Sequence, residues 1–312
     1  MTTISSAQRR VLAALLRAQG DVNTASKIAK VTKQYVYDVV RRLRNSGVKF
    51  YAEPLYRALG LTPVLVVSEE DGAEETWRRN VVFSARYYGF DGRSYKLTVF
   101  VVSEDKIDSV FRELSGRCLT VAELYDILQP VPEIGLEDFL NKAASGKFEK
   151  FQLRTIRRVS VDRYDAILMS KLGEDYFTPL KTIAEERGVN RSTLSYHYRR
   201  HVKSVIRLRY HYVPSMRLPP LLLKVTLASR DALSLLTRCS FVLEVFLGRD
   251  KSDALLITTL KAEQLWSLVR RTPSLQGTFG EISVPGMIDP TTIKRGVPDY
   301  ESLFAPTTYG RL

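Results

Sequence analysis

Several residues and motifs that mark common protein classes are scarce or missing in this 312-residue sequence. The two cysteines, Cys118 and Cys239, form neither a metal-binding spacing nor a disulfide framework. No apolar run approaches the ~20 residues needed to cross a bilayer, and the N-terminal residues lack the charged and apolar regions of a signal peptide. We therefore expect a cytoplasmic protein without a membrane partner.

Motifs of catalysis are missing as well. The sequence has no phosphate-binding loop and no nucleophile elbow, and Gly89-x-x-Gly92 is too short for a dinucleotide-binding pattern. His197 and His201 have a helical spacing that can bind zinc, but no cysteine or carboxylate nearby in the sequence completes such a site. We predict no enzymatic activity, no cofactor and no metal.

Positive charge, in contrast, is abundant. The chain has 47 Lys and Arg against 34 Asp and Glu, a net charge of +13, and an isoelectric point of about 9.7. Such an excess favours a polyanionic partner, because each cation that neutralises a phosphate releases condensed counterions. Hydrophobic residues make up 45% of the chain, which is enough for globular cores. These features indicate a globular nucleic-acid-binding protein.

The sequence also repeats itself. The apolar pattern that begins at Ile4 recurs at Val161, an offset of 157 residues, and the stretch 31–42 recurs at 189–200, an offset of 158 residues. A near-constant offset over two stretches indicates two copies of one unit.

Three helices and a short strand are predicted in the first copy. Apolar residues recur with a helical period over 4–16, Asn23 is expected to cap a short second helix, and a third helix covers 33–45 and ends at Gly47. The alternating residues 48–52 are expected to form a β-wing. This pattern is typical of a winged helix-turn-helix.

The second copy has the same pattern with stronger helix boundaries. Pro179 is expected to open its second helix, Gly188 to end it, and Asn190 or Ser192 to cap its third helix. The alternation over 206–210 predicts a strand with a solvent-exposed basic face.

The segments that follow each helical copy share the order βαββαβ, which is typical of ferredoxin-like units. In the second copy these elements are expected at 221–227, 231–238, 241–247, 254–260, 262–270 and 278–284. In the first copy they are expected at 63–68, 73–80, 81–88, 95–102, 104–114 and 120–128.

The predicted fold class is therefore α+β, an internal duplication in which two winged helix-turn-helix domains alternate with two ferredoxin-like domains. The expected boundaries are 1–55, 60–145, 161–214 and 218–312, with a basic linker over 146–160 that could also contact a DNA backbone.

Three segments resemble the leucine-responsive regulator (Lrp/AsnC) family. Residues 161–169 are similar to its first-helix pattern L-D-x-[IL]-D-x-x-I-L, residues 40–48 to V-R-R-L-x-x-x-G-[FV], and residues 245–256 to V-T-G-x-Y-D-x-L-L of its sensor domain. In the first copy, Ser5 and Gln8 replace the two acidic residues of the first-helix pattern. The resemblance implies a cytoplasmic, nucleoid-associated transcriptional regulator that binds double-stranded DNA. Family members dimerise, so this chain would act as a covalent pseudo-dimer or as a homodimer.

The exposed polar residues of each third helix are the predicted DNA contacts, because the N-terminal half of a recognition helix meets base edges in the major groove. The predicted DNA-binding residues of the first copy are Thr32, Lys33, Gln34, Tyr37, Arg41, Arg44 and Lys49. Those of the second copy are Arg191, Ser192, Thr193, Ser195, Tyr196, Arg199, Arg200, Arg207 and Arg209. The two sets differ chemically, which predicts an asymmetric operator.

Two glycine-containing loops of the α/β units are candidates for binding a small-molecule effector. The residues concerned are Gly89, Asp91, Gly92, Gly248 and Asp250. These units could equally serve assembly alone. Three other functions stay open at this point: a sequence-independent architectural DNA-binding protein, an RNA-binding or ribonucleoprotein factor that uses exposed tyrosines, and a small-molecule enzyme or sensor.

Overall fold

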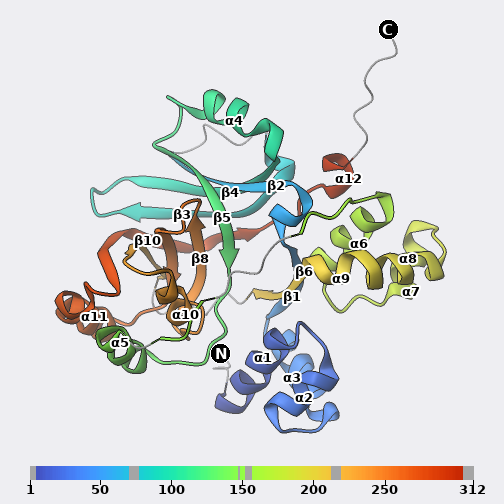
Figure 1. Cartoon of the computed structure of the whole chain (residues 1–312), viewed down its shortest axis with the longest axis horizontal. Coiled ribbons are helices and arrows are strands. Elements are labelled where there is room, and N and C mark those ends of the chain that lie inside the picture. The colour runs from blue at the N-terminus through green and yellow to red at the C-terminus, as the bar shows by residue number, and fades with distance from the viewer. Residues whose placement is uncertain (1–4, 70–76, 147, 152–156, 212–218, 305–312) are drawn as a thin grey trace.

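The computed structural model describes residues 5–69, 77–146, 148–151, 157–211 and 219–304 (Figure 1). The chain is α+β, with two clusters of helices beside a large antiparallel sheet. In the described residues, no helix has both the length and the apolar character needed to span a membrane.

The first helical cluster contains α1 (Ser6–Arg17), α2 (Val22–Ala29) and α3 (Lys33–Asn45). Its core is the apolar face of these helices, and Val11, Leu15, Val36 and Val39 are all fully buried there. The three predicted helices are confirmed, although Asp21 rather than Asn23 caps α2.

The second cluster contains α6 (Arg163–Glu174), α7 (Leu180–Arg187) and α8 (Arg191–His197). A π-helical turn (Tyr198–Val202) and α9 (Lys203–Val205) continue α8 without a break in the chain. Gly188 ends α7 with a φ of +61°, and Asn190 caps α8, as the sequence predicts.

The first helices of both clusters begin with the same capping box. The Ser5 side chain accepts from the backbone of Gln8, whose side chain accepts from the backbone of Ser5, and Asp162 and Asp165 make the equivalent bonds at α6. Ser5 and Gln8 therefore cap α1 in the same way as Asp162 and Asp165 cap α6, because both pairs accept hydrogen bonds from backbone N–H groups at the start of the helix.

The strands that follow the two clusters pair with each other. β1 (Lys49–Pro54) and β6 (Ile206–His211) form an antiparallel two-stranded ribbon, so the prediction of a separate β-wing in each copy is wrong. Tyr51 pairs with Arg209 at the middle of the ribbon, and these positions are 158 residues apart, the same offset that relates 31–42 to 189–200. The ribbon thus joins positions that the offset of the sequence repeat relates to each other.

The remaining strands of the described chain close into one barrel in the order β10-β3-β4-β2-β5-β8-β9-β7. The first copy contributes β2 (Leu61–Glu69), β3 (Val81–Gly89), β4 (Ser94–Ser103) and β5 (Thr120–Leu128). The second copy contributes β7 (Leu221–Leu227), β8 (Val242–Gly248), β9 (Asp253–Thr258) and β10 (Phe279–Arg295). Each set of four has the internal order 2-3-1-4, and the edges join through β5 with β8 and β10 with β3.

The tail of the first copy packs on the second copy. α5 (Leu136–Ser145) contacts α10 (Leu233–Leu236) and α11 (Ala262–Leu275), whereas α12 (Tyr300–Leu303) packs against α6 of its own copy. Figure 1 shows α5 beside α10 and α11, far from α4 (Ile107–Leu114), the helix of its own copy.

Three expectations about boundaries need correction or lie partly outside the described residues. β10 runs far beyond the predicted 278–284, because its second half pairs with β3 across a shift in register. Of the helix predicted at 73–80, the described part contains only a 3₁₀ turn (Arg78–Asn80), and 73–76 lie outside the described residues. Within the predicted linker, 147 and 152–156 also lie outside them, and the rest has no regular structure.

Candidate nucleic-acid interface

The outer face of α3 displays most of the predicted contacts of the first copy. Thr32, Lys33, Gln34, Tyr37 and Arg41 are exposed, and Tyr37 keeps 57% of its surface accessible. They are exposed because the opposite face of α3 carries the buried apolar stripe of the cluster core. Thr32 also has a structural role, since its hydroxyl accepts from the backbone N–H of Tyr35 at 3.2 Å and caps the helix.

Several polar groups of the α3 face already have partners within the protein. Asp38 accepts from Arg41 at 2.9 Å and from Gln34 at 3.3 Å. Arg44 pairs with Asp175 and lies over the ring of Phe177. Ligand phosphates or bases would have to compete with these contacts.

The outer face of α8 is different. Residues of α8 and of the π-helical turn that follows it surround an open surface hollow, and the residues that line it are Arg191, Ser192, Ser195, Tyr196, Arg199 and Arg200. All six belong to the predicted contact set, and Thr193 lies half-buried beside them. Among the described residues, no Asp or Glu lies within 4 Å of Arg191, Arg199 or Arg200. The hollow therefore offers three guanidinium groups that no carboxylate in the described part of the chain neutralises.

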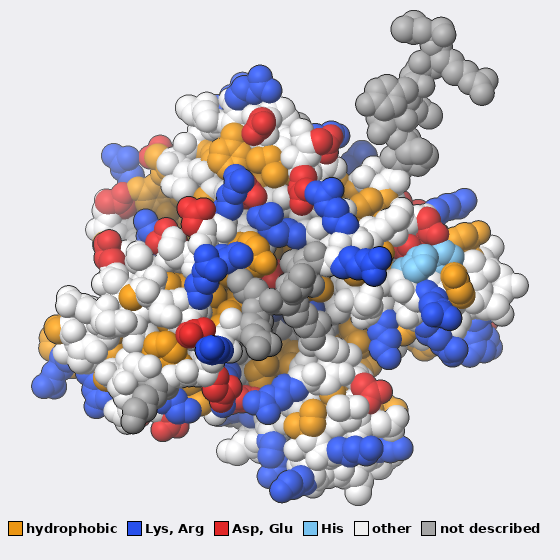
Figure 2. Space-filling model, in the orientation of Figure 1, with side chains coloured by type: hydrophobic (Ala, Val, Ile, Leu, Met, Phe, Trp, Pro, Cys, Tyr) orange, Lys and Arg blue, Asp and Glu red, His pale blue; other side chains and the backbone are white. Residues whose placement is uncertain are grey.

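The face of the molecule seen in Figure 2 carries positive side chains on both helical clusters. Lys and Arg side chains gather over the region where Figure 1 draws α7 and α8, and on the lobe formed by α1, α2 and α3. Lys49 is exposed at the start of β1, at the joint between that lobe and the ribbon.

Arg209 is buried and the Arg207 side chain is mostly buried, so the predicted solvent-exposed basic face of this strand is wrong. Arg209 is 3% exposed and pairs with Glu53 on β1, while Arg207 binds both carboxylate oxygens of Asp126 at 2.7 and 2.9 Å. Burial alone would lower the pKa of Arg209, but Glu53 and Glu244 hold that pKa above its ordinary value. These arginines stabilise the joint between the ribbon and the barrel and are unavailable to DNA.

The two helical clusters contact each other directly. The Tyr176 hydroxyl donates to the Gln19 carbonyl at 2.6 Å, and the Gln19 side chain accepts from the backbone of Leu208 at 3.0 Å. A Cβ at Gly20 would lie 2.4 Å from the Tyr176 ring, so glycine is required for this close approach. The contact fixes α3 relative to α8, and with it the separation of the two exposed basic faces.

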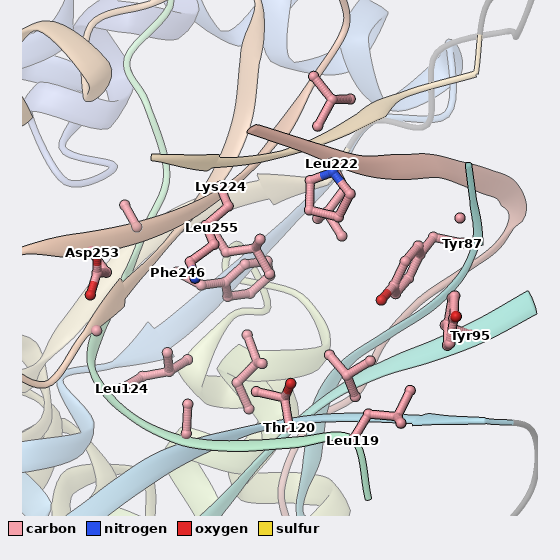
Figure 3. Close-up of a pocket in the computed structure, with 18 of the residues that line it drawn as sticks. Tyr87, Tyr95, Leu119, Thr120, Leu124, Leu222, Lys224, Phe246, Asp253 and Leu255 are labelled. Carbon is pink, nitrogen blue, oxygen red and sulfur yellow. The ribbon is translucent and has the colours of Figure 1, made fainter. Parts of the chain in front are cut away.

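A cavity of about 820 Å³ opens between the two copies inside the barrel (Figure 3). Tyr87 and Tyr95 of the first copy stand on one side of it, and Phe246 and Leu255 of the second copy stand on the other. Burial raises the pKa of Tyr87 to about 12. The walls are mainly apolar, and their charged residues are the cations Lys224 and Arg249 and the carboxylates Asp91, Glu123, Asp250 and Asp253. Such a cavity has the size and character of a site for a small amphipathic molecule.

Four of the five predicted effector-loop residues line this cavity, namely Gly89, Asp91, Gly248 and Asp250, whereas Gly92 does not. Asp91 accepts from the Tyr95 hydroxyl, which lowers the pKa of Asp91 and fixes the turn after β3. The apolar lining was not predictable from these loops alone, because it consists of barrel side chains from both copies.

In comparisons with known proteins, no family model matches the chain and no curated protein matches it.

Proposed function

We propose that this protein is a transcriptional regulator that binds double-stranded DNA through the outer faces of α3 and α8. The observation that carries the proposal is the α8 hollow, where Arg191, Arg199 and Arg200 face solvent and form no ion pair with a carboxylate of the described residues. Arg and Ser at the start of an exposed helix suit phosphate and base-edge contacts in a major groove. The net charge of +13 supports the same conclusion.

The architecture that supports this function is an internal duplication of a helix-turn-helix unit and a ferredoxin-like unit, similar to the Lrp/AsnC family. The shared capping boxes, the 2-3-1-4 strand order in both halves and the pairing of Tyr51 with Arg209 support it. On this proposal one chain supplies both recognition helices of a dimer, and their different residues read two different half-sites.

The proposal predicts that the α8 cations bind phosphates or bases. The Arg191→Ala/Arg199→Ala double variant should bind a mixed-sequence duplex at least about tenfold more weakly than wild type, with a salt slope smaller by about 2. The measurement is fluorescence anisotropy over a range of salt concentrations.

The matched control is Arg93→Ala/Arg271→Ala. Both of these arginines are exposed and paired with Glu69 and Glu137, so this variant loses the same charge elsewhere on the surface. Equal losses in the two double variants would mean that net charge alone, and not the α8 face, governs binding.

A second function, response to a small molecule, is favoured by the cavity between the copies. We expect its occupant to be an amphipathic carboxylate, with the apolar part against Phe246 and Leu255 and the carboxylate toward Lys224. Calorimetric titration with a panel of such acids tests this, and Lys224→Ala should weaken the binding of every acid that binds. Binding that Lys224→Ala leaves unchanged would contradict the expected pose.

A further inference from the structure

Four metal-ligating side chains meet at the contact between α6 and α8. The ligand atoms of Asp162, Asp165, His197 and His201 all lie within 4.8 Å of one another. His197 Nδ1 is 3.0 Å from Asp165 Oδ1 and 3.3 Å from Asp162 Oδ2, and His201 Nδ1 is 3.1 Å from Asp165 Oδ2. Figure 2 shows histidine beside acidic side chains at the surface where Figure 1 draws α6 and α8.

Backbone geometry brings the four groups together. Asp162 and Asp165 form the capping box of α6, which holds both carboxylates at the start of that helix. His197 ends α8, and His201 follows in the π-helical turn, so the two rings lie on the same side with centroids 5.2 Å apart. π-Helical turns often occur at functional sites. The carboxylates precede the histidines by more than 30 residues, so the helical spacing of the histidines did not indicate these partners.

The charge balance of the cluster favours a divalent cation. Asp165 is 2% exposed, and among the described residues its side-chain partners are the two histidines and the backbone of Asp162, with no Lys or Arg. A buried carboxylate of this kind is costly unless a cation compensates it. Two carboxylates and two neutral imidazoles around a divalent cation have no net charge.

The first copy supplies an internal comparison. With the offsets of the repeat, Ser5 and Gln8 occupy the positions of Asp162 and Asp165, and Val39 and Leu43 occupy those of His197 and His201. Val39 and Leu43 are fully buried in the apolar core of their cluster. The scaffold therefore packs well with apolar side chains at these positions, and histidine in the second copy is not needed for the fold.

We propose that Asp162, Asp165, His197 and His201 bind one zinc-class divalent transition metal, which clamps α8 onto α6. Imidazole together with carboxylate suits zinc, cobalt or nickel, whereas calcium and magnesium prefer oxygen ligands alone. Ligands at about 2.0–2.2 Å around a tetrahedral zinc are roughly 3.4 Å apart, close to the spacing found here. His201 keeps 36% of its side chain exposed and Asp162 49%, so an ion can enter from solvent.

The test uses the full chain without a histidine tag. After chelator treatment and dialysis, zinc and cobalt binding is measured by calorimetry and by the visible absorption of bound Co²⁺, with magnesium as a comparison. We expect one ion per chain, a rise in melting temperature with zinc, and no comparable effect of magnesium. Removing a residue that only hydrogen-bonds to a metal ligand typically weakens metal binding 10–100-fold. His201 and Asp162 are proposed as direct ligands, so His201→Gln or Asp162→Asn should lower the affinity for zinc by at least about tenfold.

Two variants make the outcome decisive. His211→Gln removes the third histidine of the chain, which lies on β6 outside the cluster, and should leave zinc binding unchanged. A quadruple variant that copies the first copy (Asp162→Ser, Asp165→Gln, His197→Val, His201→Leu) should fold, as judged by circular dichroism, and bind no zinc at the cluster. A wild-type chain that binds no zinc, or zinc binding that the cluster variants and His211→Gln weaken equally, would overturn the proposal. This result does not depend on DNA binding, so it can fail while the proposed function stands.

Discussion

Arg209 has its guanidinium buried where the ribbon meets the barrel, between Glu53 and the carbonyl of Ile127. Neighbouring charges are paired in the same way, Arg207 with Asp126 and Arg295 with Glu244. Because each of these groups is shielded from water, each depends on its partner for stability. The contacts of Arg207 and Arg209 therefore connect the two-stranded ribbon to the barrel.

Glu53→Gln should therefore be strongly destabilising. It leaves Arg209 buried without its main carboxylate, and we expect a loss of about 3–5 kcal/mol in the free energy of unfolding, measured by denaturant titration. As the control, Glu69→Gln breaks a pair whose two side chains are both more than half exposed, and should cost less than about 1 kcal/mol. Similar losses in the two variants would contradict a buried and interdependent charge network.

His211, at the end of β6, predicts a pH dependence of stability. Burial, helped by Arg295 and Lys49, lowers its pKa from 6.5 to about 4. Below about pH 6.5 the unfolded chain takes up a proton that the folded chain refuses until about pH 4, so this contribution to stability is lost as the pH falls through that window. Melting curves should show a smaller fall in stability between about pH 7 and pH 5 for His211→Gln than for wild type. An identical fall would show that His211 is not the group responsible.

At the scale of elements, α5 is the clearest case of a segment that stabilises the other copy. It follows the last strand of the first copy, yet Phe139 packs against Phe241 and Phe279 of the second copy, with ring centroids 5.4 and 5.7 Å apart. Phe139 is 3% exposed in the core beneath α10 and α11. The tail thus completes a core that otherwise consists mainly of residues 221–279 of the second copy.

Phe139→Ala should cost about 3–5 kcal/mol of unfolding free energy, because it opens a cavity in that core. Phe90→Ala, which removes a ring that is 68% exposed, is the control and should change stability by less than about 0.5 kcal/mol. Denaturant titration of both variants checks the prediction. A small effect at Phe139 would mean that the tail is not an integral part of the second copy's core.

The α3 face should respond to loss of its own acidic residue. Asp38→Asn frees Arg41 and Gln34, and an exposed i,i+3 pair is worth about 0.3–0.5 kcal/mol, so duplex affinity should rise about twofold. Asp108→Asn on α4 makes the same change of charge at another exposed position and should have a smaller effect. The measurement is fluorescence anisotropy with one duplex at one salt concentration. An equal rise in duplex affinity for Asp38→Asn and Asp108→Asn would contradict the proposal that the α3 face contacts DNA.

At the scale of the whole molecule, local features could be predicted from the sequence and pairings between the copies could not. The helices of both clusters and most strands follow from periodicity, Gly188 and Asn190, all of which act within a few residues. Whether β1 pairs with β6 or forms a wing depends on contacts between residues more than 150 positions apart in the sequence. Periodicity describes only local structure and does not predict such contacts. The alternation at 206–210 was correctly identified as a strand, but the carboxylates that bury its arginines come from β1 and β5.

The same limit applies to the candidate site. The exposed faces of α3 and α8 follow from helical periodicity, so their residues could be named in advance. The carboxylates beside His197 and His201, and the cavity shared by both copies, depend on how distant segments pack.

The closed barrel, the shared ribbon and the contact of Tyr176 with Gln19 connect the two clusters that contain α3 and α8, the helices proposed to read DNA. The most direct test of this account is selection of bound duplexes from a random DNA library at moderate salt, followed by sequencing. The account predicts an asymmetric motif with two half-sites about one helical turn or a multiple of it apart, and Arg191→Ala should relax one half only. Tight but salt-sensitive binding without any enriched motif would contradict it and favour an architectural DNA-binding protein. Preference for RNA over the duplex library would favour a ribonucleoprotein factor.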